Sequence, residues 1–193
     1  MSTIGKTDEL ELAQRCSKGD NLARKEVYER YAGHLLAICI RYIGDREIAQ
    51  DVLHDGFILL FRSFQKFTFQ GEGSLKAWMS RIMINEALGY LRRNKSLQVE
   101  VPLEELPGDV EQENEEDVNE IPQSLLLQWV SELPDGYRSV FNLYVFEEKS
   151  HKEIAQLLGI TEHTSSSQLF RAKSKLMKRV NEYKSERKDG RAR

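Results

Sequence analysis

The sequence predicts an all-α protein, in which a flexible acidic linker joins two small helical domains. Apolar residues recur at helical spacing in both halves, and no strand-like alternation of any length occurs. Between the halves, segment 95–122 holds three of the four prolines, and its part from Glu100 to Glu120 holds ten acidic residues and no Lys or Arg. A single-sign run of this kind is typical of a solvated linker.

Composition excludes several other classes. Of the 193 residues, 40% are hydrophobic and 31% are charged, as in an ordinary soluble chain. The longest apolar runs, Leu35–Ile40 and Phe57–Phe61, are far shorter than the ~20 residues that span a bilayer, so we expect no membrane insertion. The polar N-terminus does not resemble a signal peptide, which predicts a cytoplasmic protein. Cys16 and Cys39 are expected to be reduced, packed thiols.

The first half contains three expected helical stretches. The first covers residues 10–31, and the second opens at Asp45 with acidic residues in its first turn. This second helix carries one apolar stripe, which predicts a face toward the core or a partner. The stripe consists of Leu53, Phe57, Leu60, Phe61 and Phe64. Gly56 interrupts this helix, which indicates close packing there. After a glycine-rich loop, Ser74 is expected to cap a helix over about 75–93.

The second half ends in a helix-turn-helix pattern. Apolar stretches at 125–130 and 140–145 come first, and Ser150 with Glu153 then forms a capping box for a helix over 151–158. Gly159 provides the turn, and Thr161 or Thr164 caps the next helix.

The last helix of this pattern has polar residues suited to a DNA major groove. His163, Ser166, Ser167 and Gln168 are candidates for base contacts, while Arg171, Lys173 and Lys175 are candidates for phosphate contacts. In the alternative interpretation, the same residues form the solvent-exposed face of a helical hairpin that does not bind DNA. The charge balance favours DNA, because the residues outside Glu100–Glu120 carry +7 within a chain of −3.

A second candidate site lies on the helix at 75–93. Arg81, Asn85 and Arg92 share a narrow stripe on this helix, and aromatic residues crowd the preceding loop, namely Phe64, Phe67, Phe69 and Trp78. Aromatic rings beside amide and basic groups can hold unstacked single-stranded bases. Phenylalanines at helical spacing are equally consistent with a core, and the pattern alone leaves both interpretations open.

Both halves resemble bacterial RNA polymerase sigma factors of the extracytoplasmic-function (ECF) group, which keep two domains, regions 2 and 4. In the first half, "DREIAQDVLHDGFILLF" resembles the helix that binds core polymerase, and "GSLKAWMSRIMINEALGYLRR" resembles the promoter helix. In the second half, "LPDGYRSVFNLYVFEEKSHKEIAQLLGITEHTSSSQLFRAKSKL" is similar to region 4. We therefore expect region 2 at 8–94, the linker at 95–122, region 4 at 123–182, and a basic, disordered tail at 183–193.

The resemblance implies three binding surfaces. Core polymerase would contact Asp51, Val52, Asp55, Phe57 and Phe61. The −10 element, as it melts, would contact the loop at 67–74 and the residues Phe67, Trp78, Arg81, Asn85, Arg92 and Arg93. The −35 element would contact His163, Thr164, Ser166, Ser167, Gln168, Arg171, Lys173 and Lys175.

The resemblance also implies partners and has local exceptions. The expected partners are core RNA polymerase, promoter DNA and an anti-sigma factor, with no cofactor, metal or small-molecule substrate. Ser165 stands where Val is common, Ser166 where Lys or Arg is common, and Gln168 where Arg is common. Gly56 replaces a larger residue. The acidic linker is either a mimic of nucleic acid inside the polymerase or a solvated spacer.

Two other classes of function fit the sequence less well. The four histidines show no metal-ligand spacing among themselves or with the cysteines, and no phosphate loop or nucleophile motif is present, so we expect no enzyme and no metal site. A free-standing helix-turn-helix regulator would need a sensor or dimerisation domain in place of residues 10–93. The aromatic and Arg/Asn pattern there argues against such a regulator.

Overall fold

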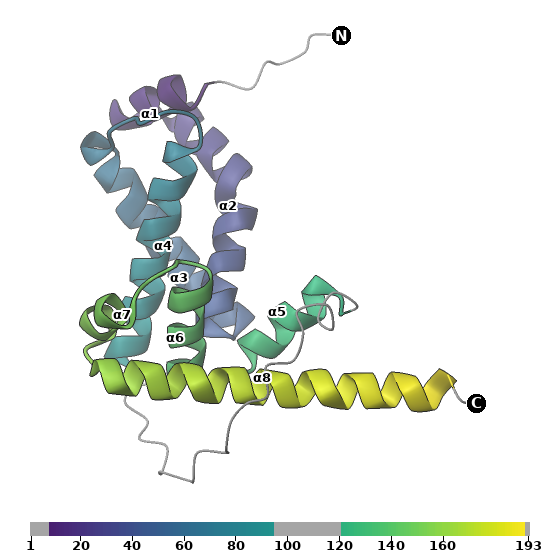
Figure 1. Cartoon of the computed structure of the whole chain (residues 1–193). Helices are drawn as coiled ribbons and strands as arrows, with labels where there is room; N and C mark the ends of the chain where they lie inside the picture. The colour runs from purple at the N-terminus through teal and green to yellow at the C-terminus, as the bar shows by residue number, and fades with distance from the viewer. Residues whose placement is uncertain (1–7, 95–120, 192–193) are drawn as a thin grey trace. The chain divides into compact units, whose positions relative to one another are not determined.

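The computed structural model describes residues 8–94 and 121–191, which contain eight α-helices, one 3₁₀ turn and no strand (Figure 1). The all-α prediction is therefore confirmed. Contacts divide the chain into two compact units, Met1–Tyr90 and Leu91–Arg193, called here the N-terminal and C-terminal units. Most of the expected acidic linker lies outside the described residues.

The N-terminal unit is built from four helices, drawn in purple to teal in Figure 1. They are α1 (Glu9–Ser17), α2 (Asn21–Ile43), α3 (Arg46–Ser63) with the 3₁₀ turn η1 (Phe64–Lys66), and α4 (Ser74–Arg93), which crosses the boundary between the units. The stretch expected to be helical over 10–31 is divided between α1 and α2, because Asp20 caps a new helix after the turn at 18–20. Helix α2 packs against both α1 and α3. The aspartates Asp8, Asp20 and Asp45 each precede a helix and accept hydrogen bonds from its first turn, which fixes where α1, α2 and α3 begin.

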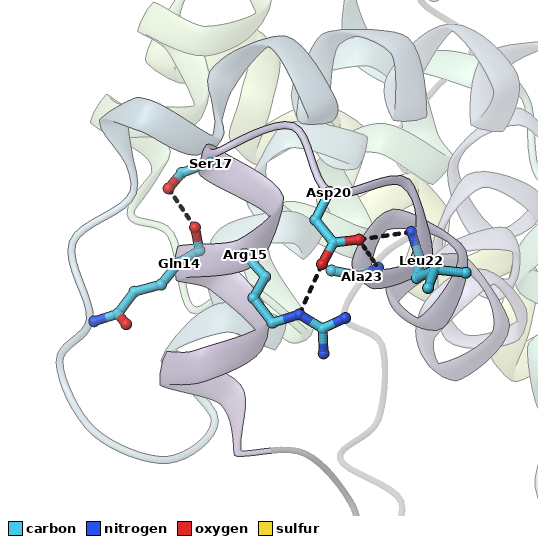
Figure 2. A network of polar contacts seen from close by, with 6 residues as sticks. All are labelled: Gln14, Arg15, Ser17, Asp20, Leu22 and Ala23. Atoms are coloured by element: carbon cyan, nitrogen blue, oxygen red, sulfur yellow. Dashed lines mark hydrogen bonds and ion pairs between the residues drawn. The ribbon is translucent and has the colours of Figure 1, made fainter.

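The corner between α1 and α2 is held by Asp20 (Figure 2). One oxygen of its carboxylate accepts hydrogen bonds from the amides of Leu22 and Ala23 at 2.8 and 3.2 Å, and the other accepts from Arg15 Nε at 2.9 Å. The hydrogen bond from Arg15 is the main cause that lowers the pKa of Asp20. Asp20 thus caps α2 and ties it to the last turn of α1.

Helices α3 and α4 approach each other closely at Gly56. A methyl group at Gly56 would lie 2.3 Å from Sδ of Met83, a residue of α4 that is fully buried. The expectation of tight packing at this glycine is therefore confirmed. Gly56 allows the helix expected to meet polymerase to pack directly on the helix expected to meet the promoter.

Both cysteines are free, buried thiols. Burial raises the pKa of Cys16 from 9.0 to about 11 and that of Cys39 to about 12. The folded state favours the neutral form of both thiols. Their contribution to the free energy of unfolding is therefore complete below pH 9 and is lost as the pH rises through the folded-state pKa values.

We expect neither thiol to react with Ellman's reagent at pH 8 in the native protein, because the thiolate is the nucleophile and both sulfurs are shielded. After unfolding in guanidinium, two thiols per chain should react within minutes. The measurement is the absorbance of the released chromophore with and without denaturant. Equal rates in the two states would contradict the burial of both side chains.

The C-terminal unit, drawn in green to yellow in Figure 1, has four further helices. They are α5 (Gln123–Ser131), α6 (Asp135–Val145), α7 (His151–Leu158) and α8 (Glu162–Arg191). Helices α5, α6 and α7 each pack against α8. Arg138 joins α5 to α6, since its buried guanidinium donates to the carbonyls of Ser131 and Leu133 and pairs with Asp135.

The local signals of the helix-turn-helix are confirmed. Ser150 Oγ accepts from the Glu153 amide, and the Glu153 carboxylate accepts from the Ser150 amide, which completes the capping box. The amide and the hydroxyl of Ser150 both donate to the Glu153 carboxylate, and these two hydrogen bonds lower its pKa. Gly159 has φ 70°, and Thr161 Oγ1 accepts from the Thr164 amide at 3.0 Å, so Thr161 is the cap of α8.

Helix α8 is longer than the sequence indicated. The expected disordered tail at 183–193 is helical as far as Arg191 in the structure. Tyr183 packs edge-on against Trp129 of α5, with ring centroids 6.0 Å apart. The same cluster buries Val180 and Ile121, a residue that the expected linker at 95–122 had included. The prediction of a disordered tail is wrong. The basic composition of the tail gives no information on α5, whose Trp129 packs against Tyr183 at the start of the tail.

Candidate functional site

The loop before α4 brings aromatic rings together. Trp78, one turn into α4, lies 5.1 Å from the Phe67 ring and 5.3 Å from the Phe64 ring, measured between centroids. Phe64 is buried, whereas Phe67 and Trp78 are half-buried and keep part of their rings accessible. Gly71 and Gly73 have φ values of 107° and 84°, which only glycine adopts readily, so the loop can turn sharply into α4.

The polar residues expected beside these rings are exposed on α4. Arg81, Asn85, Arg92 and Arg93 are all solvent-exposed. Arg81 follows Trp78 by three residues and Asn85 follows Arg81 by four, so the three side chains lie along one side of the helix. The arrangement combines accessible aromatic rings with an amide and basic groups, as a site for unstacked bases requires.

The expected polymerase-binding set on α3 is only partly on the surface. Asp51 and Asp55 are exposed, and Phe61 is half-buried beneath the guanidinium of Arg24, 5.7 Å from the ring centroid. Val52 and Phe57 are each only 4% exposed, so they support the helix and do not form its outer face. Phe57 faces inward against α2, where its ring centroid lies 4.8 Å from that of Tyr28.

The outer face of α3 includes two apolar residues outside the expected polymerase-binding set. Ile58 is 40% exposed and Leu59 is 41% exposed. Their signal was present in the sequence, because the unbroken run Phe57–Phe61 is wider than the single stripe that one helical face can bury. On the neighbouring helix α2, Leu22 and Tyr28 are 73% and 50% exposed.

A continuous row of aromatic rings joins α2 and α3 to the loop before α4. Successive ring centroids are 4.8 to 6.2 Å apart along Tyr28, Phe57, Phe61, Phe64, Trp78 and Phe67. Contacts of this kind stabilise a core beyond the area that they bury. We call this set the aromatic row.

In the C-terminal unit, the residues expected to meet the −35 element divide into two groups. His163, Ser166, Lys173 and Lys175 are exposed, whereas Thr164, Ser167, Gln168 and Arg171 are half-buried. Of these side chains, Arg171, Lys173 and Gln168 contact other helices. Arg171 donates to the Tyr137 hydroxyl at 3.3 Å, and Lys173 Nζ lies 5.7 Å from the centre of the Tyr144 ring.

Gln168, an expected base contact, has its side chain turned toward α6. Its amide lies against the backbone of α6, where a methyl group on Gly136 would be 3.0 Å from Nε2. Its Oε1 is buried. At the position of Gln168 on α8, helical periodicity allows the side chain to point either to solvent or to α6. Gly136 has no side chain, and the Gln168 amide fills the space that this leaves.

Ser165, which departs from the usual family residue, is fully buried between the two helices of the motif. His151 Nδ1 and Ser165 Oγ are 2.9 Å apart, and the His151 ring stacks on Tyr144 with centroids 5.0 Å apart. A buried polar pair therefore lies where α7 and α8 meet.

Glu9, outside every expected site, accepts a hydrogen bond from the backbone of the loop before α4. No local signal could have identified this contact, because Glu9 and Gly73 are 64 residues apart in the chain.

The comparisons with known proteins agree with the division of the chain into an N-terminal and a C-terminal unit. Residues 27–97 match the family Sigma-70 region 2, and residues 123–176 match Sigma-70, region 4. Together the two segments span more than half of the chain, in the order expected for a two-domain sigma factor. The chain belongs to the sigma-70 family, as a member of its ECF group, and it directs promoter-specific transcription initiation.

The chain is similar to several characterised sigma factors over most of its length. It is 28% identical to the ECF RNA polymerase sigma-E factor of Escherichia coli, over 90% of this chain and 94% of that one. It is 27% identical to the ECF RNA polymerase sigma factor SigM of Bacillus subtilis (78% and 91%) and 26% identical to the RNA polymerase sigma-H factor of Pseudomonas aeruginosa (87% and 91%). A solved structure of CnrH in complex with the cytosolic domain of CnrY is 21% identical, with a TM-score of 0.44 over 89% of this chain and 96% of that one.

Family membership establishes the general activity. A sigma factor binds core RNA polymerase and DNA and is not itself an enzyme. Within 8–94 and 121–191, no helix is long and apolar enough to cross a membrane, and no three His, Cys, Asp or Glu side chains gather as metal ligands would.

Proposed function

We propose that the two parts of this sigma factor divide promoter recognition between them. In this proposal, region 2 covers residues 8–94, docks on core polymerase through α3 and holds the melted −10 element. Region 4 covers residues 123–182 and reads the −35 element as duplex DNA. The protein works in the cytoplasm, where polymerase and promoters are.

The observation that carries the −10 proposal is the placement of Trp78 and Phe67 beside Arg81 and Asn85. The two rings contact each other at 5.1 Å yet stay partly accessible, so a base leaving the duplex can stack against them. The exposed amide of Asn85 can bond to a base edge, and Arg81 can pair with the backbone of the same strand. Arg92 and Arg93 extend the basic surface toward the end of the helix.

The outer face of α3 supports the proposal for polymerase. Asp51 and Asp55 provide charge, while Ile58 and Leu59 provide apolar area that no described neighbour covers completely. Interfaces commonly combine an apolar centre with a polar rim. Through the aromatic row, this face is packed continuously with the rings proposed to hold the base.

For the −35 element we propose His163, Ser166 and Ser167 as the residues that reach base edges from the first turns of α8. Arg171, Lys173 and Lys175 would contact phosphates one turn further on. Gln168 takes a supporting role against Gly136. Direct readout of base edges is therefore left to His163, Ser166 and Ser167. Phosphate contacts and DNA shape then contribute more to −35 recognition than they would if Gln168 also read a base.

Replacing Lys175 by alanine should weaken binding to all promoters by a similar factor and reduce the salt slope of log K by about 1, because a phosphate contact releases about one counterion. Ser166→Ala on the same helix should instead change the preference among −35 sequences. The measurement is holoenzyme affinity for two promoters at several salt concentrations. A Lys175→Ala variant that changed sequence preference and left the salt slope intact would contradict this assignment.

The function as a whole is tested by run-off transcription. Purified protein and core polymerase are incubated with fragmented DNA of the source organism, and the 5′ ends of the transcripts are sequenced. We expect discrete start sites that share two spaced upstream motifs. Starts at random positions, together with normal footprints of the protein alone on duplex DNA, would instead indicate a free-standing regulator.

We further propose that an anti-sigma factor controls this protein, as the ECF resemblance implies. Co-purification from the source organism, followed by inhibition of the run-off reaction by the captured protein, tests this. Run-off activity that no co-purified protein reduces would contradict it.

A further inference from the structure

Glu9, the first residue of α1, connects three parts of the N-terminal unit. Its Oε1 accepts a hydrogen bond from the Tyr31 hydroxyl at 3.0 Å. Its Oε2 accepts from the backbone amides of Gly73 and Leu75 at 2.8 and 3.3 Å. One carboxylate thus joins α1, α2 and the start of α4, and we call these bonds the Glu9 clamp.

The clamp provides the cap that α4 does not make for itself. The first amides of a helix have no partner within the helix, and a negative charge is favoured near them. Ser74 was expected to cap α4, but its Oγ accepts from the Gln70 amide across the loop at 3.2 Å. Glu9 therefore takes the place of a local cap from 64 residues away in the chain.

Glu9 is itself held firmly. Helix α1 buries Leu12, Ala13 and Cys16, so its first residue cannot shift without moving the core. Tyr31 is also buried, and burial together with the bond to Glu9 raises the pKa of its hydroxyl, which stays protonated as a donor. The clamp is a fixed point to which the loop is attached.

The loop needs such a fixed point. It turns through two glycines, Gly71 and Gly73, which have the largest conformational freedom of any residue. Phe67 stands at one end of the loop, and Trp78 follows its other end by one turn of α4. Without the clamp, the loop would have to be ordered at the moment when a base binds, which lowers affinity.

We propose that Glu9 is a positioning residue, which holds the loop 67–74 in the conformation that receives an unpaired base of the −10 element. The inference rests on the proposed function, in which this loop and Trp78 bind the melted strand. It adds a residue outside the DNA surface that determines how well that surface is formed.

The test uses full-length protein in holoenzyme with a fork-junction promoter, taken from the mapped start sites, whose −10 element is single-stranded. Glu9→Ala should reduce affinity for this DNA about tenfold or more, because both backbone bonds are lost. Glu9→Gln keeps an amide oxygen as acceptor and should lose less than threefold. Affinity for core polymerase and for a −35 duplex should stay unchanged in both variants.

Two controls separate positioning from general stability. Asp20→Ala removes the cap of α2 and so also destabilises this unit, but it does not touch the loop. At temperatures where the folded fractions are equal, Asp20→Ala should bind the fork-junction DNA like the wild type. Tyr31→Phe removes one bond of the clamp and keeps both bonds to the loop backbone, so it should lose less affinity than Glu9→Ala.

Wild-type affinity in Glu9→Ala, or an equal loss in Asp20→Ala, would overturn the proposal. Failure of the underlying function gives a different result, since Arg81→Ala and Asn85→Ala would then also bind the fork-junction DNA normally. If those two variants lose affinity and Glu9→Ala does not, only the role of Glu9 is refuted.

Discussion

Alanine in place of Asn85 or of Arg81 is expected to lower the formation of open promoter complexes by roughly 5- to 150-fold, because a specific side-chain contact to nucleic acid contributes about 1–3 kcal/mol. Both side chains are exposed on α4, so their loss should change the free energy of unfolding by no more than about 0.5 kcal/mol. The measurement is permanganate reactivity of unpaired thymines in the −10 element, with holoenzyme at the mapped promoter.

The matched control is Lys76→Ala, an exposed residue of the same helix that removes the same charge as Arg81→Ala. It should leave promoter opening unchanged. All three variants should co-purify with core polymerase as the wild type does. If Asn85→Ala or Arg81→Ala failed to co-purify, the two surfaces would have to be exchanged, and α4 would be the polymerase contact.

Gly56→Leu is expected to destabilise the N-terminal unit by about 2–4 kcal/mol. Even the first atom of the new side chain would lie 2.3 Å from Sδ and 3.0 Å from Cε of Met83, which is fully buried, and the remaining carbons of leucine would need further space in the same core. Overpacking of this kind typically costs about 1–3 kcal/mol and occasionally more. The measurement is urea unfolding, followed by the fluorescence of Trp78 in a Trp129→Phe background.

Gly33 provides the control, because it lies within α2 and a methyl group there would meet no atom of another element within 4 Å. Gly33→Ala should therefore stabilise the unit by up to about 1 kcal/mol through helix propensity. The double variant Gly56→Leu/Met83→Ala should be less destabilised than the sum of its single changes. Additive effects in that double variant would show that the two side chains do not compete for the same space.

Much of the candidate site was predictable because it depends on neighbours in the sequence. The capping box at Ser150 and Glu153, the turn at Gly159 and the cap at Thr161 involve residues a few positions apart, and all were confirmed. The exposed stripe of Arg81 and Asn85 follows from helical periodicity alone. The family resemblance required both halves, since each motif is short and only their order and spacing are specific.

Other features of the site depend on which surfaces meet. Whether Val52 and Phe57 face a partner or the core could not be determined from α3, because its apolar run is wide enough for both. Whether Gln168 reaches DNA depends on a glycine 32 positions earlier, and the number of ordered turns at the end of α8 depends on Trp129 of α5.

The sequence by itself determined the all-α class, the capping box and turn of the helix-turn-helix, the order of the two regions and the membership of the ECF sigma factors. These properties are encoded in contacts between residues within about one helical turn, or in the pattern of the whole chain. Only the tertiary structure decided which side of α3 is exposed, where the Gln168 amide lies and that Glu9 caps α4. Those outcomes depend on contacts between distant segments, whose free energy depends on packing that no local pattern specifies.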